Sequence, residues 1–78
     1  MSTLERVQKV LAAVLRAPME SVGPSARLSE IAALDSLSLA EIASAVDEEF
    51  RVRLPADDLA TVLTVADLVR LVEHAPSR

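Results

Sequence analysis

An aspartate, a serine and a leucine stand together at residues 35–37, directly before a stretch with helical periodicity. A serine at the start of a helix lies beside backbone N–H groups that have no partner within the helix, at the positive end of the helix dipole. A phosphoester on Ser36 would therefore be held at low electrostatic cost. The simpler alternative is that Ser36 only caps the helix, since serine is a preferred N-cap residue.

Ser36 lacks the surroundings of a hydrolase nucleophile. The only histidine, His74, lies near the end of the chain, and no Gly-x-Ser-x-Gly elbow surrounds the serine. The chain has no cysteine, which excludes disulfides, cysteine zinc sites and thiol nucleophiles, and we predict no metal site. We identify no catalytic residue.

The elements that position Ser36 are expected to be helices in one domain, residues 1–78. Hydrophobic residues make up 51% of the chain, yet Phe50 is the only aromatic one, so the core must be aliphatic. One glycine and four prolines are too few for the closely spaced turns of an all-β fold. The composition therefore favours packed helices.

Hydrophobic periodicity predicts four helices, over residues 3–16, over 36–51, over one to two turns after Pro55, and over 64–75. Ser2 with Glu5 and Thr64 with Asp67 have the spacing of capping boxes at two of the starts. The second helix carries a core stripe of Ile42, Val46 and Phe50. We predict an all-α fold, a small four-helix bundle whose third helix is short.

A long loop separates the first two predicted helices. It covers 19 residues, from Ala17 to Asp35, whereas connections in helical bundles usually take about 2 to 8. Leu28, Ile31 and Leu34 could form one packed turn there, over the core. Loops of this length in compact domains are usually functional when they are not disordered. The loop ends at Asp35, directly before Ser36.

The acidic charge of the chain is concentrated in its middle. The net charge is −4, but residues 35–67 hold eight acidic and two basic side chains. Such a segment argues against a nucleic-acid partner and favours partners with a basic patch. No apolar stretch is long enough for a membrane span, and the N-terminus does not read as a signal peptide. We expect a cytoplasmic protein that binds neither nucleic acid nor membrane.

Four segments together resemble the acyl carrier protein family over essentially the whole chain. They are Asp-Ser-Leu at 35–37, VDEEF at 46–50, RLPADDL at 53–59 and LTVADLV at 63–69. The resemblance implies that Ser36 is esterified by 4′-phosphopantetheine from coenzyme A, with Asp35 as part of the flanking motif, through a separate Mg-dependent phosphopantetheinyl transferase. The reactive thiol then belongs to the prosthetic group. The resemblance implies a carrier, expected to be monomeric, and not an enzyme.

Four residues are candidates for docking partner enzymes. Glu41 and Glu48 are two helical turns apart and share one face, and Asp47 is expected to flank that stripe. Leu37 is similar to the apolar docking residue of the family. We expect Arg51, four residues after Asp47, to pair with it. The alternative is that this acidic face is only solvated surface.

Several departures from the family pattern bear on the pathway. Ala33 stands where the family usually has glycine, Ser38 where an acid often follows, and Leu71 where an aromatic residue is common. With the modest net charge, these favour a carrier of polyketide, nonribosomal or hybrid antibiotic-type biosynthesis over housekeeping fatty acid biosynthesis. The predicted partners are an acyl- or aminoacyl-loading enzyme and ketosynthase-type or condensation-type enzymes. A peptidyl carrier remains an alternative, although Asp35 favours acyl cargo, and so does a helical interaction module that is never modified.

Overall fold

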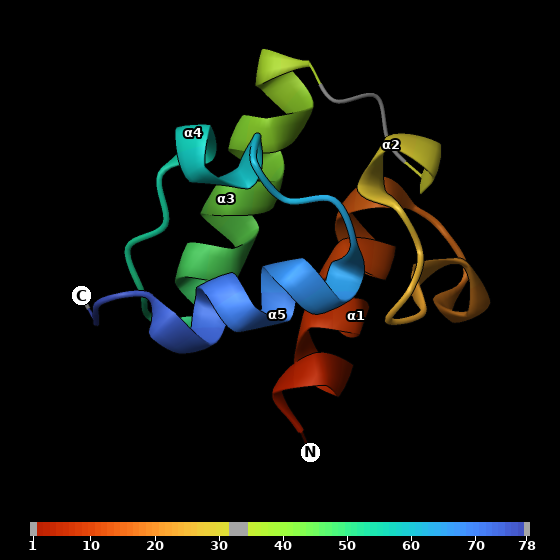
Figure 1. The fold of residues 1–78 in the computed structure, drawn as a ribbon, viewed down its shortest axis with the longest axis horizontal. Coiled ribbons are helices and arrows are strands. Elements are labelled where there is room, and N and C mark those ends of the chain that lie inside the picture. Colours follow the sequence, from red (N-terminus) through yellow and green to blue (C-terminus); the bar gives the residue numbers. More distant parts are fainter. Residues whose placement is uncertain (1, 32–34, 78) are drawn as a thin grey trace.

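In the computed structural model, which describes residues 2–31 and 35–77, helices lie at the four predicted places (Figure 1). They are α1 (Thr3–Leu15), α3 (Ser36–Phe50), α4 (Ala56–Leu59) and α5 (Val65–His74). The prediction of a small all-α bundle with a short third helix is therefore confirmed. None of the helices in the described part of the chain is long and apolar enough to cross a bilayer.

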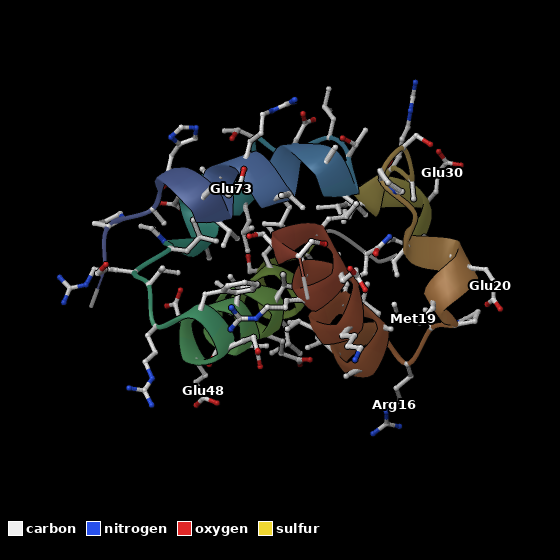
Figure 2. The ribbon with its side chains drawn as sticks, turned by 90° about the horizontal axis from the view of Figure 1, so that it is seen from below. Arg16, Met19, Glu20, Glu30, Glu48 and Glu73 are labelled. Atoms are coloured by element: carbon white, nitrogen blue, oxygen red, sulfur yellow. The ribbon has the colours of Figure 1, made fainter. Side chains whose placement is uncertain are left out.

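The core is aliphatic and lies between two layers of helices. Figure 2 shows α5 on one side of the molecule and α1 together with α3 on the other. Within the described residues, no polar or charged side chain is buried. Phe50 is only partly buried and packs against the edge of this core. The most deeply buried side chains of the described residues, each with a relative exposure of 0%, are Val7, Leu11, Val22, Ile42, Val46, Val65 and Leu68.

The long connection between α1 and α3 contains two short helical elements. One is the 3₁₀-helix η1 (Met19–Val22), which the sequence did not predict, and the other is α2 (Leu28–Ile31). Leu28 is buried and Ile31 packs against the core, so the predicted packed turn is confirmed for these two residues, while Leu34 lies outside the described residues. The side-chain amide of Gln8 on α1 donates to the carbonyl of Val22 (3.1 Å). The connection is thus fastened to α1.

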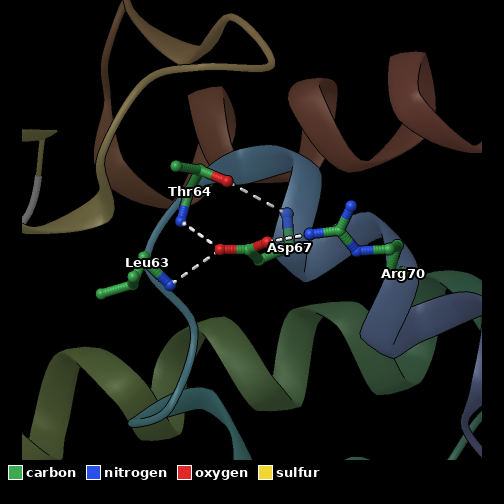
Figure 3. Close-up of polar contacts among 4 residues, drawn as sticks. All are labelled: Leu63, Thr64, Asp67 and Arg70. Carbon is green, nitrogen blue, oxygen red and sulfur yellow. Dashed lines mark hydrogen bonds and ion pairs between the residues drawn. The ribbon is translucent and has the colours of Figure 1, made fainter.

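The other end of the connection is hydrogen-bonded to the start of α5. The Leu28 N–H donates to the Leu63 carbonyl, and the Val65 N–H donates to the Ala26 carbonyl, both at 3.0 Å. The capping box predicted at this start is confirmed: Thr64 Oγ1 accepts the Asp67 N–H, and the Asp67 carboxylate accepts the Thr64 N–H, both at 3.2 Å (Figure 3). This junction connects the middle of the chain to its last helix.

Arg6 joins α1 to the end of α3. Its guanidinium pairs with the Glu49 carboxylate (3.1 Å), donates to the Glu49 carbonyl (2.9 Å) and lies 4.4 Å from the centre of the Phe50 ring. Ion pairs between exposed side chains contribute little by themselves. A cation over an aromatic face adds about 0.5 to 1 kcal/mol at exposed sites. The three contacts together hold the first helix against the second long one.

We predict that Arg6→Ala lowers the free energy of unfolding by about 1 kcal/mol, because it removes the ion pair and the cation–π contact together. Lys9→Ala, one turn further along the same helix, is the control and should stay within about 0.5 kcal/mol of the parent chain. Urea denaturation of both variants measures the difference. Equal losses in the two variants would show that the Arg6 contacts do not stabilise the bundle.

Candidate functional site

The start of α3 is capped by Asp35 and not by Ser36. Asp35 has extended backbone angles (φ −91°, ψ 171°), and its Oδ1 accepts the backbone N–H of Ser38 at 2.8 Å. Its carbonyl accepts the Leu39 N–H as the first hydrogen bond of the helix. Ser36 is therefore the first helical residue, one position past the cap. The interpretation of Ser36 as a mere helix cap is wrong, because the neighbouring carboxylate fills that role.

Ser36 and Leu37 both face solvent at this end of the bundle. Ser36 is exposed, and 70% of Leu37 is exposed. None of the hydrogen bonds found among the described residues involves the Ser36 hydroxyl, so its oxygen can be approached by another molecule. A group attached there would lie beside the positive end of the 15-residue helix α3, where negative charge is stabilised.

The Asp35 carboxylate stays charged beside this hydroxyl over a wide pH range. The hydrogen bond from the Ser38 backbone N–H, followed by one from the Ser38 side chain, lowers the pKa of Asp35 below its ordinary value of 3.8. Both donors favour the ionised form. At neutral pH the cap is therefore a carboxylate acceptor, which is the state that the helix terminus favours.

Three of the four predicted docking residues lie on one outward face of α3. Leu37, Glu41 and Glu48 are all exposed, at spacings of four and seven residues that bring them to the same side of the helix. Figure 2 shows Glu48 pointing away from the bundle near the C-terminal end of α3. The structure thus brings together an apolar side chain next to Ser36 and two carboxylates along the same helix.

Asp47 lies away from this face, contrary to the prediction that it flanks the stripe. It is half-buried, and its Oδ1 accepts the backbone N–H of Leu54 at 2.9 Å. The predicted ion pair between Asp47 and Arg51 is also wrong. The two residues are instead joined through the backbone, because the Arg51 N–H donates to the Asp47 carbonyl. Asp47 holds the loop before α4 against α3.

A family model described as "Phosphopantetheine attachment site" matches residues 5–72. The chain belongs to this family. Members of the phosphopantetheine-attachment family carry 4′-phosphopantetheine as a covalently attached group. The match covers most of α1, the long connection, α3, α4 and most of α5.

The residues at the start of α3 fit this prosthetic group. A phosphodiester needs a hydroxyl that is accessible and not occupied by a structural hydrogen bond, and the cap at Asp35 leaves the Ser36 hydroxyl in that state. When attached, the group supplies a thiol that carries acyl groups as thioesters. At this place the chain offers an exposed hydroxyl and the helix terminus beside it.

We predict that the Ser38 amide proton reports the titration of Asp35. An aspartate whose pKa is lowered in the folded state contributes stability that is complete above its ordinary pKa of 3.8, and this contribution is lost as the pH falls through the lower, folded value. The Ser38 amide proton shift should therefore move with a midpoint below pH 3.8. NMR spectra recorded across this range measure it.

The matched variant is Asp35→Asn, which keeps an oxygen acceptor for the Ser38 N–H but cannot ionise. The acid-dependent shift of the Ser38 amide should disappear in this variant. Asp67 is the internal control, because the Thr64 backbone N–H lowers its pKa too and its titration should persist. A Ser38 shift that survives in Asp35→Asn would show that another group controls the start of α3.

Proposed function

We propose that Ser36 is the attachment residue for 4′-phosphopantetheine and that the chain is an acyl carrier protein of a polyketide or hybrid natural-product pathway. The observation that supports Ser36 is its exposed hydroxyl at the first position of α3, left free by the Asp35 cap. In the attachment step the Ser36 oxygen bonds to the pantetheine-linked phosphorus of coenzyme A and loses its proton, while the nucleotide part leaves. A phosphopantetheinyl transferase with Mg²⁺ catalyses this step, so the chain is a substrate and shuttle.

The outward face of α3 supports docking of enzymes with basic surfaces. Leu37 is an exposed apolar contact beside the attachment residue, and Glu41 and Glu48 supply negative charge further along the helix. Charges placed in this way steer association and fix its register. We infer that the transferase, an acyl-loading enzyme and ketosynthase-type enzymes bind this face. Asp47 is left out of it, because its carboxylate holds Leu54.

The pathway is inferred from the residues around the serine and from the overall charge. Asp35 precedes Ser36, which favours acyl cargo over the aminoacyl cargo of a peptidyl carrier. A net charge of only −4, with eight basic side chains, supports a specialised pathway over housekeeping fatty acid synthesis.

We predict that Ser36→Ala abolishes the phosphopantetheine adduct that forms on incubation with coenzyme A, Mg²⁺ and a broad-specificity transferase. Its free energy of unfolding should change by no more than about 0.5 kcal/mol, because Asp35 keeps the cap and Ser36 is exposed. Intact-mass spectrometry measures the adduct. Ser44→Ala, the same change on an exposed position of the same helix, should still gain one adduct.

Two outcomes would contradict the proposal. An adduct on Ser36→Ala would place the attachment on another residue. A parent chain that gains no adduct with any of several transferases would support the alternative of a helical interaction module that is never modified.

We further predict that the double variant Glu41→Lys, Glu48→Lys is loaded several-fold more slowly than the parent chain at low salt. The difference should shrink at high salt, because ions screen exposed charges beyond about 10 Å at 0.1 M. The matched control is Glu20→Lys, Glu73→Lys, which makes the same change in net charge on η1 and α5. Equal slowing in both variants would assign the effect to net charge and not to the α3 face.

A further inference from the structure

An open groove follows the seam between α1 and α3. One part of it has a volume of about 350 Å³ and lies between Val10, Ala13 and Val14 on α1 and Ala45 on α3, with two glutamates at its α3 side. A neighbouring hollow of about 220 Å³ shares three residues with the first and extends it past Arg6 and Lys9. We call this continuous depression the seam groove. Its floor is apolar, and its edges are charged.

The two edges of the seam groove carry opposite charges. Glu49 is already paired with Arg6 and therefore adds little net charge. Glu48 on the α3 edge and Lys9 on the α1 edge are both exposed, and neither takes part in the ion pairs found among the described residues. Glu41 lies two turns before Glu48 on the same face of α3, outside the residues that line the groove. The groove thus has an acidic edge along α3 and a basic edge along α1.

This charge pattern selects one kind of occupant. Protein interfaces combine an apolar centre with a polar rim, and an amphipathic helix commonly binds by laying its apolar stripe into a groove. The floor of Val10, Ala13 and Ala45 suits such a stripe. The acidic edge requires basic residues on one flank of the incoming helix, and Lys9 requires an acid on the other.

We propose that the seam groove docks an amphipathic helix of a partner enzyme, with lysines or arginines on the flank that meets Glu48 and an acidic residue on the flank that meets Lys9. The inference rests on the proposed carrier function, because it supplies the enzymes that such a surface serves. It extends the docking surface from the outer face of α3 across to α1. The opposite charges of the two edges favour one direction of the bound helix, because the same helix bound in the reverse direction would place like charges together.

The test uses a synthetic helical peptide as the probe. Its leucines occupy positions i, i+3 and i+7, with lysines along one flank and glutamates along the other. A second peptide of the same composition has lysines and glutamates alternating along each flank, so that neither direction of binding matches both edges. Titration of the isotopically labelled, unmodified chain followed by NMR should move the amide signals of α1 and α3 that line the seam groove. The mixed-flank peptide should bind at least about tenfold more weakly.

Two variants of the carrier identify the groove. Ala13→Glu places a carboxylate on the apolar floor at an exposed position, and it should weaken the first peptide about tenfold or more. Lys9→Glu makes both edges acidic and should weaken the first peptide, because its glutamate flank then meets a carboxylate. Ala60→Glu adds the same side chain as Ala13→Glu at an exposed position after α4 and should leave binding unchanged.

Three results would overturn the proposal. They are signal changes confined to the region of Leu37, equal binding of the two peptides, and an affinity that Ala13→Glu does not alter. Seam signals that move with the concentration of the chain alone would assign the groove to a second copy instead. Because the titration uses the unmodified chain, failed peptide binding with normal loading at Ser36 refutes only the groove, and failed loading refutes only the attachment.

Discussion

The rest of the bundle depends on the hydrogen-bonded junction between the long connection and the start of α5. The Asp67 carboxylate accepts the N–H groups of Thr64 and Leu63 and pairs with Arg70 (Figure 3). The chain around Leu28 is hydrogen-bonded to this same turn. A chain of 78 residues with an aliphatic core can bury only a limited apolar area, so a connection of this length must contribute side chains to the core and stay fixed. The junction meets both requirements.

At the start of α3, as at the start of α5, a side chain accepts a hydrogen bond from a backbone N–H group that has no partner within the helix. The starts of α1, α3 and α5 each have a side-chain cap, supplied by Ser2, Asp35 and Thr64. Two of these caps are hydroxyls, so a hydroxyl at the start of a helix in this chain is usually occupied. The Ser36 hydroxyl does not serve as a cap, because the Asp35 carboxylate already accepts the Ser38 N–H. Because the cap is on Asp35 and not on Ser36, the helix start does not require the Ser36 hydroxyl, which we propose as the attachment oxygen.

Much of the fold could be predicted because its signals are local. The spacing of Ile42 and Val46 on α3 and the two capping boxes each involve residues within one or two helical turns. These patterns placed α1, α3, α4 and α5, and the apolar residues of the connection indicated α2. The 3₁₀-helix η1 was missed, because Met19–Val22 has no periodicity that distinguishes it from a loop.

The site was predicted less completely because its details depend on contacts distant in sequence. Helical spacing places Asp47 near the stripe of Glu41 and Glu48, but it does not show that the loop after α3 returns to use its carboxylate. Arg6 and Glu49 are 43 residues apart, so no sequence pattern relates them. The seam groove, which needs the approach of α1 to α3, could not be found for the same reason. Serine and aspartate are both good caps, so the residues alone did not decide between Asp35 and Ser36.

The most direct test of the account is to locate the attached group in the chain with its natural sequence. The carrier is loaded from coenzyme A by a transferase and fragmented as an intact protein under conditions that keep phosphodiesters bound. If Ser36 carries the group, the added mass is present in every N-terminal fragment that includes Ser36 and in none that ends before it. Added mass that maps to Ser29, Ser38 or Ser44 instead would contradict the claim that the Asp35 cap leaves Ser36 as the attachment residue.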